Sequence, residues 1–466
     1  RLKHLPKTDL AGLKSFLPED LRTKFDRINI AGSGEGEIKV YKRFKEPTPL
    51  AVSGRIKIKG ASFNSPDMPE GPEKIMGDVI FENEAIYFSR ASFVYGKKSY
   101  LVDAKIEDFK TPDIKMRLES KDFLIDARLK LFPESIHILR ASGNYLNSPF
   151  NISGTVSDIK NAQVSLKGNI KLDLVNLRTL LPGISEPLTR FGIKGICDLE
   201  FDLKGPWKEF RNWDAVVKGK SERINIWDLK FDSVKLDLRI KQNALLLNEL
   251  SAKPYGGALF SNMEIDLTQP NPPYTANLVL DGVDLNKLIA DTDLKGRTMS
   301  GTAALKTTLR GYGKNTDTMK GEGSVLIKGS YLWEMPLLKG LGDLLFLPNL
   351  SSIVFEEVSG NFIITNKTIT TSNLGFHSKG ISLLAEGGVN FDGNLDLMVT
   401  TSVSEDFVKD TSEFQRLAGL LFAQAGQFLG NIKINGTIKK PEYKFVPFAL
   451  DKVLPDKFKD LLGGFF

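Results

Sequence analysis

The sequence predicts a mainly β protein, with a long antiparallel sheet of repeating hairpins and a few short amphipathic helices. Three observations support this fold class. Apolar and charged residues alternate along most of the chain, Gly, Asn, Asp or Pro interrupts them every ten or so residues, and similar phrases recur far apart. This alternation has the two-residue period of a strand with one buried face and one solvent-exposed face. The interruptions have the spacing of turns in a meander.

The clearest strands place apolar and charged residues in strict turn, so we expect a sheet that is covered on one side only. They are GRIKIKGA (54–61), DARLKLF (126–132), GNIKLDL (168–174), SVKLDLRIKQ (233–242) and NIKINGTIKK (431–440).

Helices are expected in three short segments, 9–25, 336–346 and 412–429. In the second, Leu337, Leu338 and Leu341 share one helical face while Lys339 lies opposite. Such an apolar stripe favours packing in the core over contact with a membrane.

Three phrases share a hairpin pattern: VIFENEAIYF, LRIKQNALLL and FIITNKTITT align on Asn83, Asn243 and Asn366. Each has an apolar strand, a polar turn centred on Asn and a second apolar strand. Asn suits this turn because it tolerates the left-handed backbone that a two-residue hairpin loop requires. The separations between the copies are unequal, which indicates a long repeated unit with variable insertions and not a short-period solenoid.

Composition sets the broad class. The chain has 466 residues, of which 41% are hydrophobic and 26% charged, and this is typical of a folded globular protein. Its 63 basic and 57 acidic residues are interleaved, whereas nucleic-acid binding needs a concentrated basic face, so no nucleic-acid partner is expected. The single cysteine, Cys197, excludes an internal disulfide and is expected to be a buried small hydrophobe.

Catalytic motifs are missing from the sequence. GSGEGE (32–37) lacks the Lys-Ser/Thr ending of a phosphate-binding loop and leads into a strand. His4, His137 and His377 are isolated in sequence, without the spacing of zinc ligands. We therefore expect no catalytic residues, no metal, no cofactor and no enzymatic activity.

One region carries a family resemblance. VDLNKLI is followed by GTAALKTTLRG, GEGSVLIKGSYL, an amphipathic segment, FEEVSGNFIITNKTITTSNLGF and INGTIKKPEYKF, and upstream stands LSAKPYGGALFSNMEIDL with Tyr255, Gly256 and Gly257. This order resembles the C-terminal region of the AsmA-like family of envelope proteins in Gram-negative bacteria. The expected organisation is a helical lead-in or the end of a preceding unit (1–27), an upstream β-groove repeat region (28–174), an AsmA-like C-terminal β-groove region (175–447) and an amphipathic tail (448–466).

The resemblance implies a function. Members of this family are thought to form a long, curled antiparallel sheet, a groove with an apolar inside, and to carry phospholipids along it between the inner and outer membranes, so the resemblance implies a curled, groove-forming sheet here. It implies a non-enzymatic bridge-like lipid transfer protein that supports outer-membrane biogenesis, located in the periplasm and anchored to the inner membrane by a segment absent from this chain. Its partners would be phospholipid or another acyl lipid, and a membrane or envelope protein at the ends of the groove. The alternative is a structural envelope scaffold that acts through its sheet edges.

Alternation predicts which apolar side chains line the groove. The candidates are Ile56, Ile58, Val79, Phe81, Ile86, Leu236, Leu238, Leu246, Phe362, Ile364 and Ile369. A charge at Ile363 or Ile369 is also expected to block transport. In the tail, apolar residues combined with lysines suit a lipid interface, which makes the following residues candidates for membrane or partner docking: Phe458, Leu461, Leu462, Phe465 and Phe466.

Overall fold

The computed structural model describes residues 5–10, 29–41, 51–64, 70–82, 85–158, 161–176, 192–332, 337–338, 340–341, 354–403 and 428–446. The chain divides into two compact units. Unit 1 comprises residues 1–185 and 196–219, and unit 2 comprises residues 186–195 and 220–466. β13 (Asp214–Ile226) contains the boundary at residues 219 and 220.

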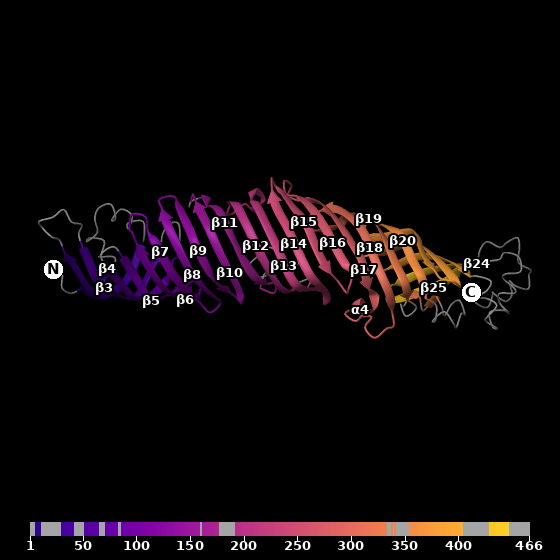
Figure 1. Ribbon diagram of the computed structural model, residues 1–466, viewed down its shortest axis with the longest axis horizontal. Coiled ribbons are helices and arrows are strands. Elements are labelled where there is room, and N and C mark those ends of the chain that lie inside the picture. Colours follow the sequence, from indigo (N-terminus) through magenta and orange to yellow (C-terminus); the bar gives the residue numbers. More distant parts are fainter. Residues whose placement is uncertain are drawn as a thin grey trace, which may run out of the picture. The chain divides into compact units, whose positions relative to one another are not determined.

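Unit 1 is an antiparallel meander in which each strand pairs with the next one in the chain (Figure 1). Its strands are β1 (Leu5–Asp9), β2 (Asn29–Tyr41), β3 (Ala51–Asn64), β4 (Glu73–Glu82), β5 (Ala85–Tyr95), β6 (Lys98–Glu107), β7 (Asp113–Glu119), β8 (Phe123–Phe132), β9 (Ser135–Tyr145), β10 (Ser148–Ser157), β11 (Gln163–Asp173) and β12 (Lys194–Pro206). A 3-10 helix, η4 (Phe210–Asn212), lies between β12 and β13.

Unit 2 continues the same pattern, again with consecutive strands paired antiparallel. Its elements are β14 (Leu229–Lys241), β15 (Ala244–Lys253), β16 (Ala258–Asp266), β17 (Pro273–Asp284), α4 (Leu285–Ile289), β18 (Ser300–Tyr312), β19 (Asn315–Tyr331), β20 (Phe355–Thr365), β21 (Thr368–His377), β22 (Ile381–Asn390), β23 (Leu395–Val403), β24 (Phe428–Thr437) and β25 (Lys440–Val446).

The mainly β, antiparallel prediction is confirmed, while the curled groove form of the sheet stays a prediction. GSGEGE lies inside β2, as a strand. Within the predicted helix 336–346, residues 337–338 and 340–341 are helical, and the amphipathic helix as a whole stays a prediction. Asp9 ends a strand, and nearly all the rest of the predicted helices 9–25 and 412–429 lies outside the described residues.

The Asn turns are confirmed where they are described. Asn243 and its neighbour Gln242 have φ values of 60° and 51°, and Asn366 and Lys367 have 50° and 57°. Two consecutive residues with positive φ are the geometry that lets a two-residue loop follow the right-handed twist of its strands. Asn83 lies outside the described residues.

Candidate functional site

One face of unit 1 is apolar across ten consecutive strands. Directly opposite residues of an antiparallel ladder project to the same face, so the strand registers define rows that cross the sheet. A central row contains Ile56, Val79, Phe88, Ala104, Met116, Ala127, Ala141, Ile152, Gly168 and Phe201.

Two further rows flank the central row on the same face. One contains Phe81, Ile86, Ile106, Ile114, Leu129, Ile138, Gly154, Leu166 and Leu203. The other contains Ala91, Val102, Leu118, Ile125, Gly143, Phe150, Ile170 and Leu199. We call these three rows the apolar face of unit 1.

Most side chains of this face are only half-buried, including Ile114, Met116, Ile138 and Ile152. Both hydrophobic clusters that the described residues form belong to unit 2. Among the described residues of unit 1, therefore, no second layer buries this face as a core would. What it offers chemically is contact with apolar groups.

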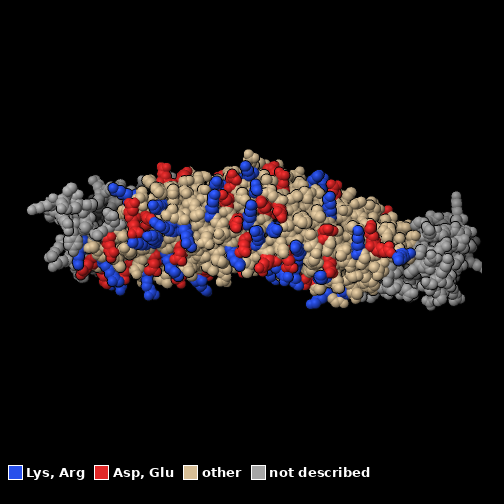
Figure 2. All heavy atoms as spheres, in the orientation of Figure 1, with Lys and Arg blue, Asp and Glu red and all other residues tan. Residues whose placement is uncertain are grey.

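The opposite face of unit 1 is polar and held by ion pairs between neighbouring strands. Arg55 contacts Asp78 at 2.7 Å, and Arg128 contacts Asp113 at 2.8 Å. The Glu107 carboxylate accepts hydrogen bonds from Lys105 and Lys115, and these bonds hold its pKa below the usual value. Figure 2 shows acidic and basic side chains interspersed over the strands of unit 1. This charged face is therefore the side of the sheet that is exposed to solvent.

The two ends of these strands differ. At one end lie the turns 95–98, 119–123 and 145–148, where aromatic rings border the apolar face. The ring centroids of Phe93 and Tyr100 are 5.1 Å apart, and those of Tyr100 and Phe123 are 5.6 Å apart. Tyr145 stands opposite Phe123 in the ladder. We call these three turns the tyrosine lip.

The turns at the other strand ends, 107–113, 132–135 and 157–163, form what we call the acidic lip. Backbone hydrogen bonds join neighbouring turns, from Leu131 N to Pro112 O (2.9 Å) and from Asp158 N to Glu134 O (3.0 Å). The described residues of these turns carry five carboxylates and one lysine, in Glu107, Asp108, Lys110, Asp113, Glu134 and Asp158. The apolar face ends here in aliphatic side chains, Leu131, Ile136, Val156 and Val164.

The predicted groove residues fall as follows. Ile56, Val79, Phe81 and Ile86 lie in the rows of unit 1, and Ile58, two residues along β3 from Ile56, projects to the same face. In unit 2, the registers likewise place on one face Leu236, Leu238, Phe362, Ile364 and Ile369.

Two positions need correction. Leu246 stands opposite Arg239 and Glu264, on the other face from Leu238. It lies in the run Leu245–Leu247, where alternation cannot indicate which leucines point inward. Ile363 stands opposite Glu322 and Thr370 and is 59% exposed, whereas its neighbour Ile364 is 8% exposed.

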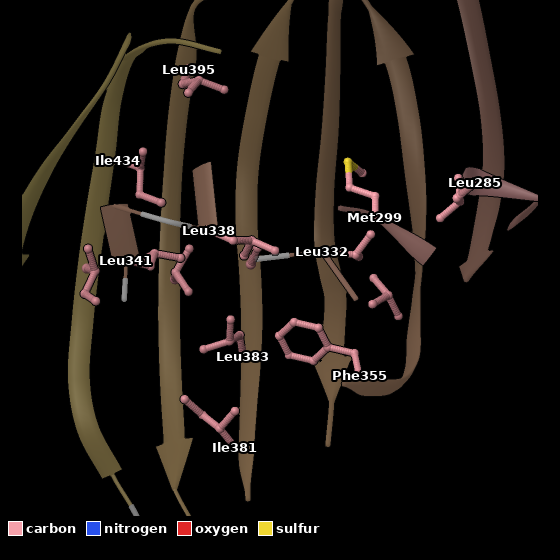
Figure 3. Close-up of a cluster of buried hydrophobic side chains, with 14 of the residues drawn as sticks. Leu285, Met299, Leu332, Leu338, Leu341, Phe355, Ile381, Leu383, Leu395 and Ile434 are labelled. Atoms are coloured by element: carbon pink, nitrogen blue, oxygen red, sulfur yellow. The ribbon is translucent and has the colours of Figure 1, made fainter. Parts of the chain in front are cut away.

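The apolar face of unit 2 is closed over its last strands. Leu285 and Ile289 of α4 and the helical residues Leu338 and Leu341 pack on it, in a cluster that also includes Ile432. Figure 3 shows Leu285, Leu338 and Leu341 with Phe355, Leu383 and Ile434 of the same cluster. The Tyr443 hydroxyl donates to Leu337 O at 3.0 Å, and Gly340 lies against the Tyr443 ring, where a larger residue would collide. We call the region from β18 to β25 the closed section.

A polar network fixes the loop after α4. The Tyr255 hydroxyl donates to Asp291 at 2.9 Å and accepts from Lys230 N at 2.9 Å, and Lys230 Nζ contacts Asp291 at 2.8 Å. Burial raises the pKa of Tyr255, which therefore stays protonated and able to donate at neutral pH. The Tyr255 phrase noted in the sequence thus has a structural role that sequence alone did not indicate.

The described residues offer weaker candidates for a polar pocket, a metal site or a membrane-spanning segment. A hollow of about 960 Å³ lies between charged side chains of the polar face of unit 1, including Lys105, Lys115 and Arg128. It is an open depression, so we place the candidate site on the apolar face. No group of three or more potential metal ligands gathers among the described residues. No helix in the described part of the chain has the length and apolar character to cross a membrane.

Other predicted residues are placed as follows. Cys197 is buried, as predicted. The docking candidates Phe458, Leu461, Leu462, Phe465 and Phe466 lie outside the described residues.

No family model, curated protein or solved structure matches this chain. The class that the fold defines is an antiparallel β protein with a long apolar sheet face.

Proposed function

We propose that this protein is a non-enzymatic bridge-like lipid transfer protein that carries phospholipid along the apolar face of its sheet. The observation that carries this proposal is the continuity of three apolar rows across β5–β12, most of whose side chains are half-buried, backed by a charged face. A large unfilled apolar surface on a folded chain indicates a partner that is itself apolar.

Magnitudes favour an acyl lipid as that partner. Two acyl chains of roughly 16 carbons would cost on the order of 25 kcal/mol to hold in water, at ~0.8 kcal/mol per methylene. Contact with a continuous apolar surface removes most of this cost. Rows of aliphatic side chains hold a chain without preferring one position, and this permits sliding along the sheet.

The AsmA-like resemblance extends the proposal to location and route. It favours a curled, groove-forming sheet in the periplasm, anchored to the inner membrane, and transfer toward the outer membrane. A membrane or envelope protein would meet each end of the groove.

The alternative is a scaffold that binds partners by strand addition at its edges. In the described part of the chain, β25 pairs with β24 on one side. Yet β25 carries Lys440, Pro441 and Lys444, and lysine and proline at an edge oppose further pairing. This sequence makes strand addition at β25 the weaker candidate.

A matched pair of variants tests the proposal. Ile138 lies in a row of the apolar face, while Leu139, the next residue, is 45% exposed and lines a polar-face hollow with Arg140. We expect phospholipid in an organic extract of the purified protein and transfer between vesicles in vitro. Ile138→Glu should lower both at least threefold, and Leu139→Glu should change neither. A purified protein free of lipid that also transfers none would refute the proposal.

A further inference from the structure

The two lips of unit 1 present different chemistry to a bound lipid. The described turns of the tyrosine lip carry three lysines and two carboxylates, Lys97, Lys98, Lys121, Glu119 and Asp122, whereas the acidic lip has five carboxylates and one lysine. Two of these carboxylates, Glu107 and Asp113, are paired with Lys105, Lys115 and Arg128 on the polar face, which leaves Asp108, Glu134 and Asp158 beside one lysine at the acidic lip. A phosphate group therefore meets a net negative charge there and can find a cation at the tyrosine lip.

The tyrosine lip also joins polar groups to the apolar face. Lys98 Nζ contacts Asp122 at 2.8 Å, and the Lys98 side chain is 51% exposed. The pKa of Lys98 is raised, chiefly by the hydrogen bond with Asp122 and to a smaller degree by the nearby Tyr145 and Tyr100. Two phenol groups, an ammonium and a carboxylate thus gather where the apolar rows end.

This mixture matches the boundary region of a phospholipid. Tyrosine has an apolar ring and a polar tip, which suits it to the level between acyl chains and headgroups. A lysine donates three hydrogen bonds to phosphate oxygens, and Asp122 or Glu119 can pair with a headgroup amine. At the acidic lip the apolar rows end in aliphatic side chains, the described turns carry no tyrosine, and their one lysine, Lys110, stands among carboxylates.

We propose that bound phospholipids lie in one orientation on unit 1, with the headgroup phosphate at the tyrosine lip and the acyl chains along the strands toward the acidic lip. This inference rests on the proposed function and adds a direction across the sheet. Strands of about ten residues span roughly 33 Å at ~3.3 Å per residue, which gives the chains room to lie along them. Lipids would then slide from strand to strand with their headgroups on one side.

Single fluorophores at the two lips test the orientation. Lys121→Cys and Glu134→Cys place a label at the tyrosine lip and the acidic lip, because both residues are exposed. Cys197 is buried, so the unmodified protein controls for background labelling. Each labelled protein is loaded with a phospholipid that carries a nitroxide quencher either on its headgroup or near the end of one acyl chain.

We expect the headgroup nitroxide to quench the label at 121 at least twofold more than the label at 134, with the order reversed for the chain-end nitroxide. Equal quenching at the two lips, or the opposite order, would overturn the orientation while leaving lipid binding intact. Absence of quenching by both lipids at both sites would instead refute lipid binding itself.

A charge-reversal variant gives a second test. Replacing the tyrosine-lip lysines by K97E, K98E and K121E should lower bound phospholipid at least threefold and leave bound diacylglycerol, which lacks the phosphate, unchanged. Lys110→Glu at the acidic lip is the matched control and should change neither. Equal loss of both lipids in the triple variant would contradict a headgroup role.

Discussion

The apolar face of unit 1 extends over β3–β12 without a helix packed on it among the described residues, whereas the closed section of unit 2 is covered by α4 and the helical residues near 338. Both regions consist of similar alternating strands paired with their chain neighbours. What differs is the connections, because those after β17 and β19 supply Leu285, Ile289, Leu338 and Leu341 to the face. The same kind of antiparallel sheet therefore serves as a surface in one unit and as half of a core in the other.

The largest expected effect comes from a charge placed in each region. Ile432 in the closed section is 0% exposed, so Ile432→Glu would bury an unpaired carboxylate and lower the free energy of unfolding by about 4 kcal/mol or more. Ile138→Glu on the half-buried face of unit 1 should cost less than roughly half of that. Urea unfolding followed by circular dichroism measures both variants. Similar losses would mean that the two faces are equally buried.

Truncation of an aromatic ring should show the same contrast on a smaller scale. Phe355 is 0% exposed and packs on Phe376 with ring centroids 5.5 Å apart. Phe355→Ala should cost about 3–5 kcal/mol through lost burial and the cavity left behind. Phe88→Ala, in the central row of unit 1, should cost markedly less, since Phe88 is only half-buried. An equal cost in a urea titration would contradict the open face.

The network that fixes the loop after α4 gives a smaller effect. Tyr255→Phe removes the hydrogen bond to Asp291 and should lower the free energy of unfolding by roughly 1 kcal/mol. Proteolysis within the loop 290–299 should become faster, because that loop loses one of its ties to the sheet. Tyr274→Phe, whose hydroxyl makes no hydrogen bond to a described residue, serves as the control. Identical behaviour of the two variants would exclude this role for Tyr255.

The smallest effect is a dependence on pH. The pKa of Asp291 lies below its usual value because Lys230 and then Tyr255 hydrogen-bond its carboxylate. A carboxyl with a lowered pKa stabilises the fold above its ordinary pKa, and this contribution is lost as the pH falls through the folded value, below about 4. The stability difference between the wild-type protein and Asp291→Asn should therefore shrink between pH 6 and pH 3. A difference that stays constant over this range would show that Asp291 contributes nothing through its charge.

Much of the fold was predictable because strands with one wet face show their period directly in the sequence. Asn243 and Asn366 marked turns correctly, since few residues tolerate positive φ. Leu246 and Ile363 were misassigned because each lies in an apolar run, where only the register with Arg239 or Glu322 reveals the face. α4 spans five residues, which is too short for helical periodicity, although Asp284 caps it by accepting from Lys287 N.

The chemistry of the site was less accessible from sequence. The tyrosine and acidic lips draw on turns far apart in the chain, and only the antiparallel registers bring Tyr100, Phe123 and Tyr145 to one end of the strands. The closed section depends on which connections fold back onto the sheet, and this follows from tertiary packing.

The central claim is that acyl chains occupy the apolar face of unit 1. The most direct test is crosslinking with a phospholipid whose acyl chain carries a photoreactive diazirine, followed by mass spectrometry of the modified peptides. The account predicts crosslinks at row residues such as Met116, Ile125 and Ile152, and none at Leu139 on the polar face or Phe355 in the closed section. Crosslinks spread equally over both faces, or concentrated at Leu139, would contradict it.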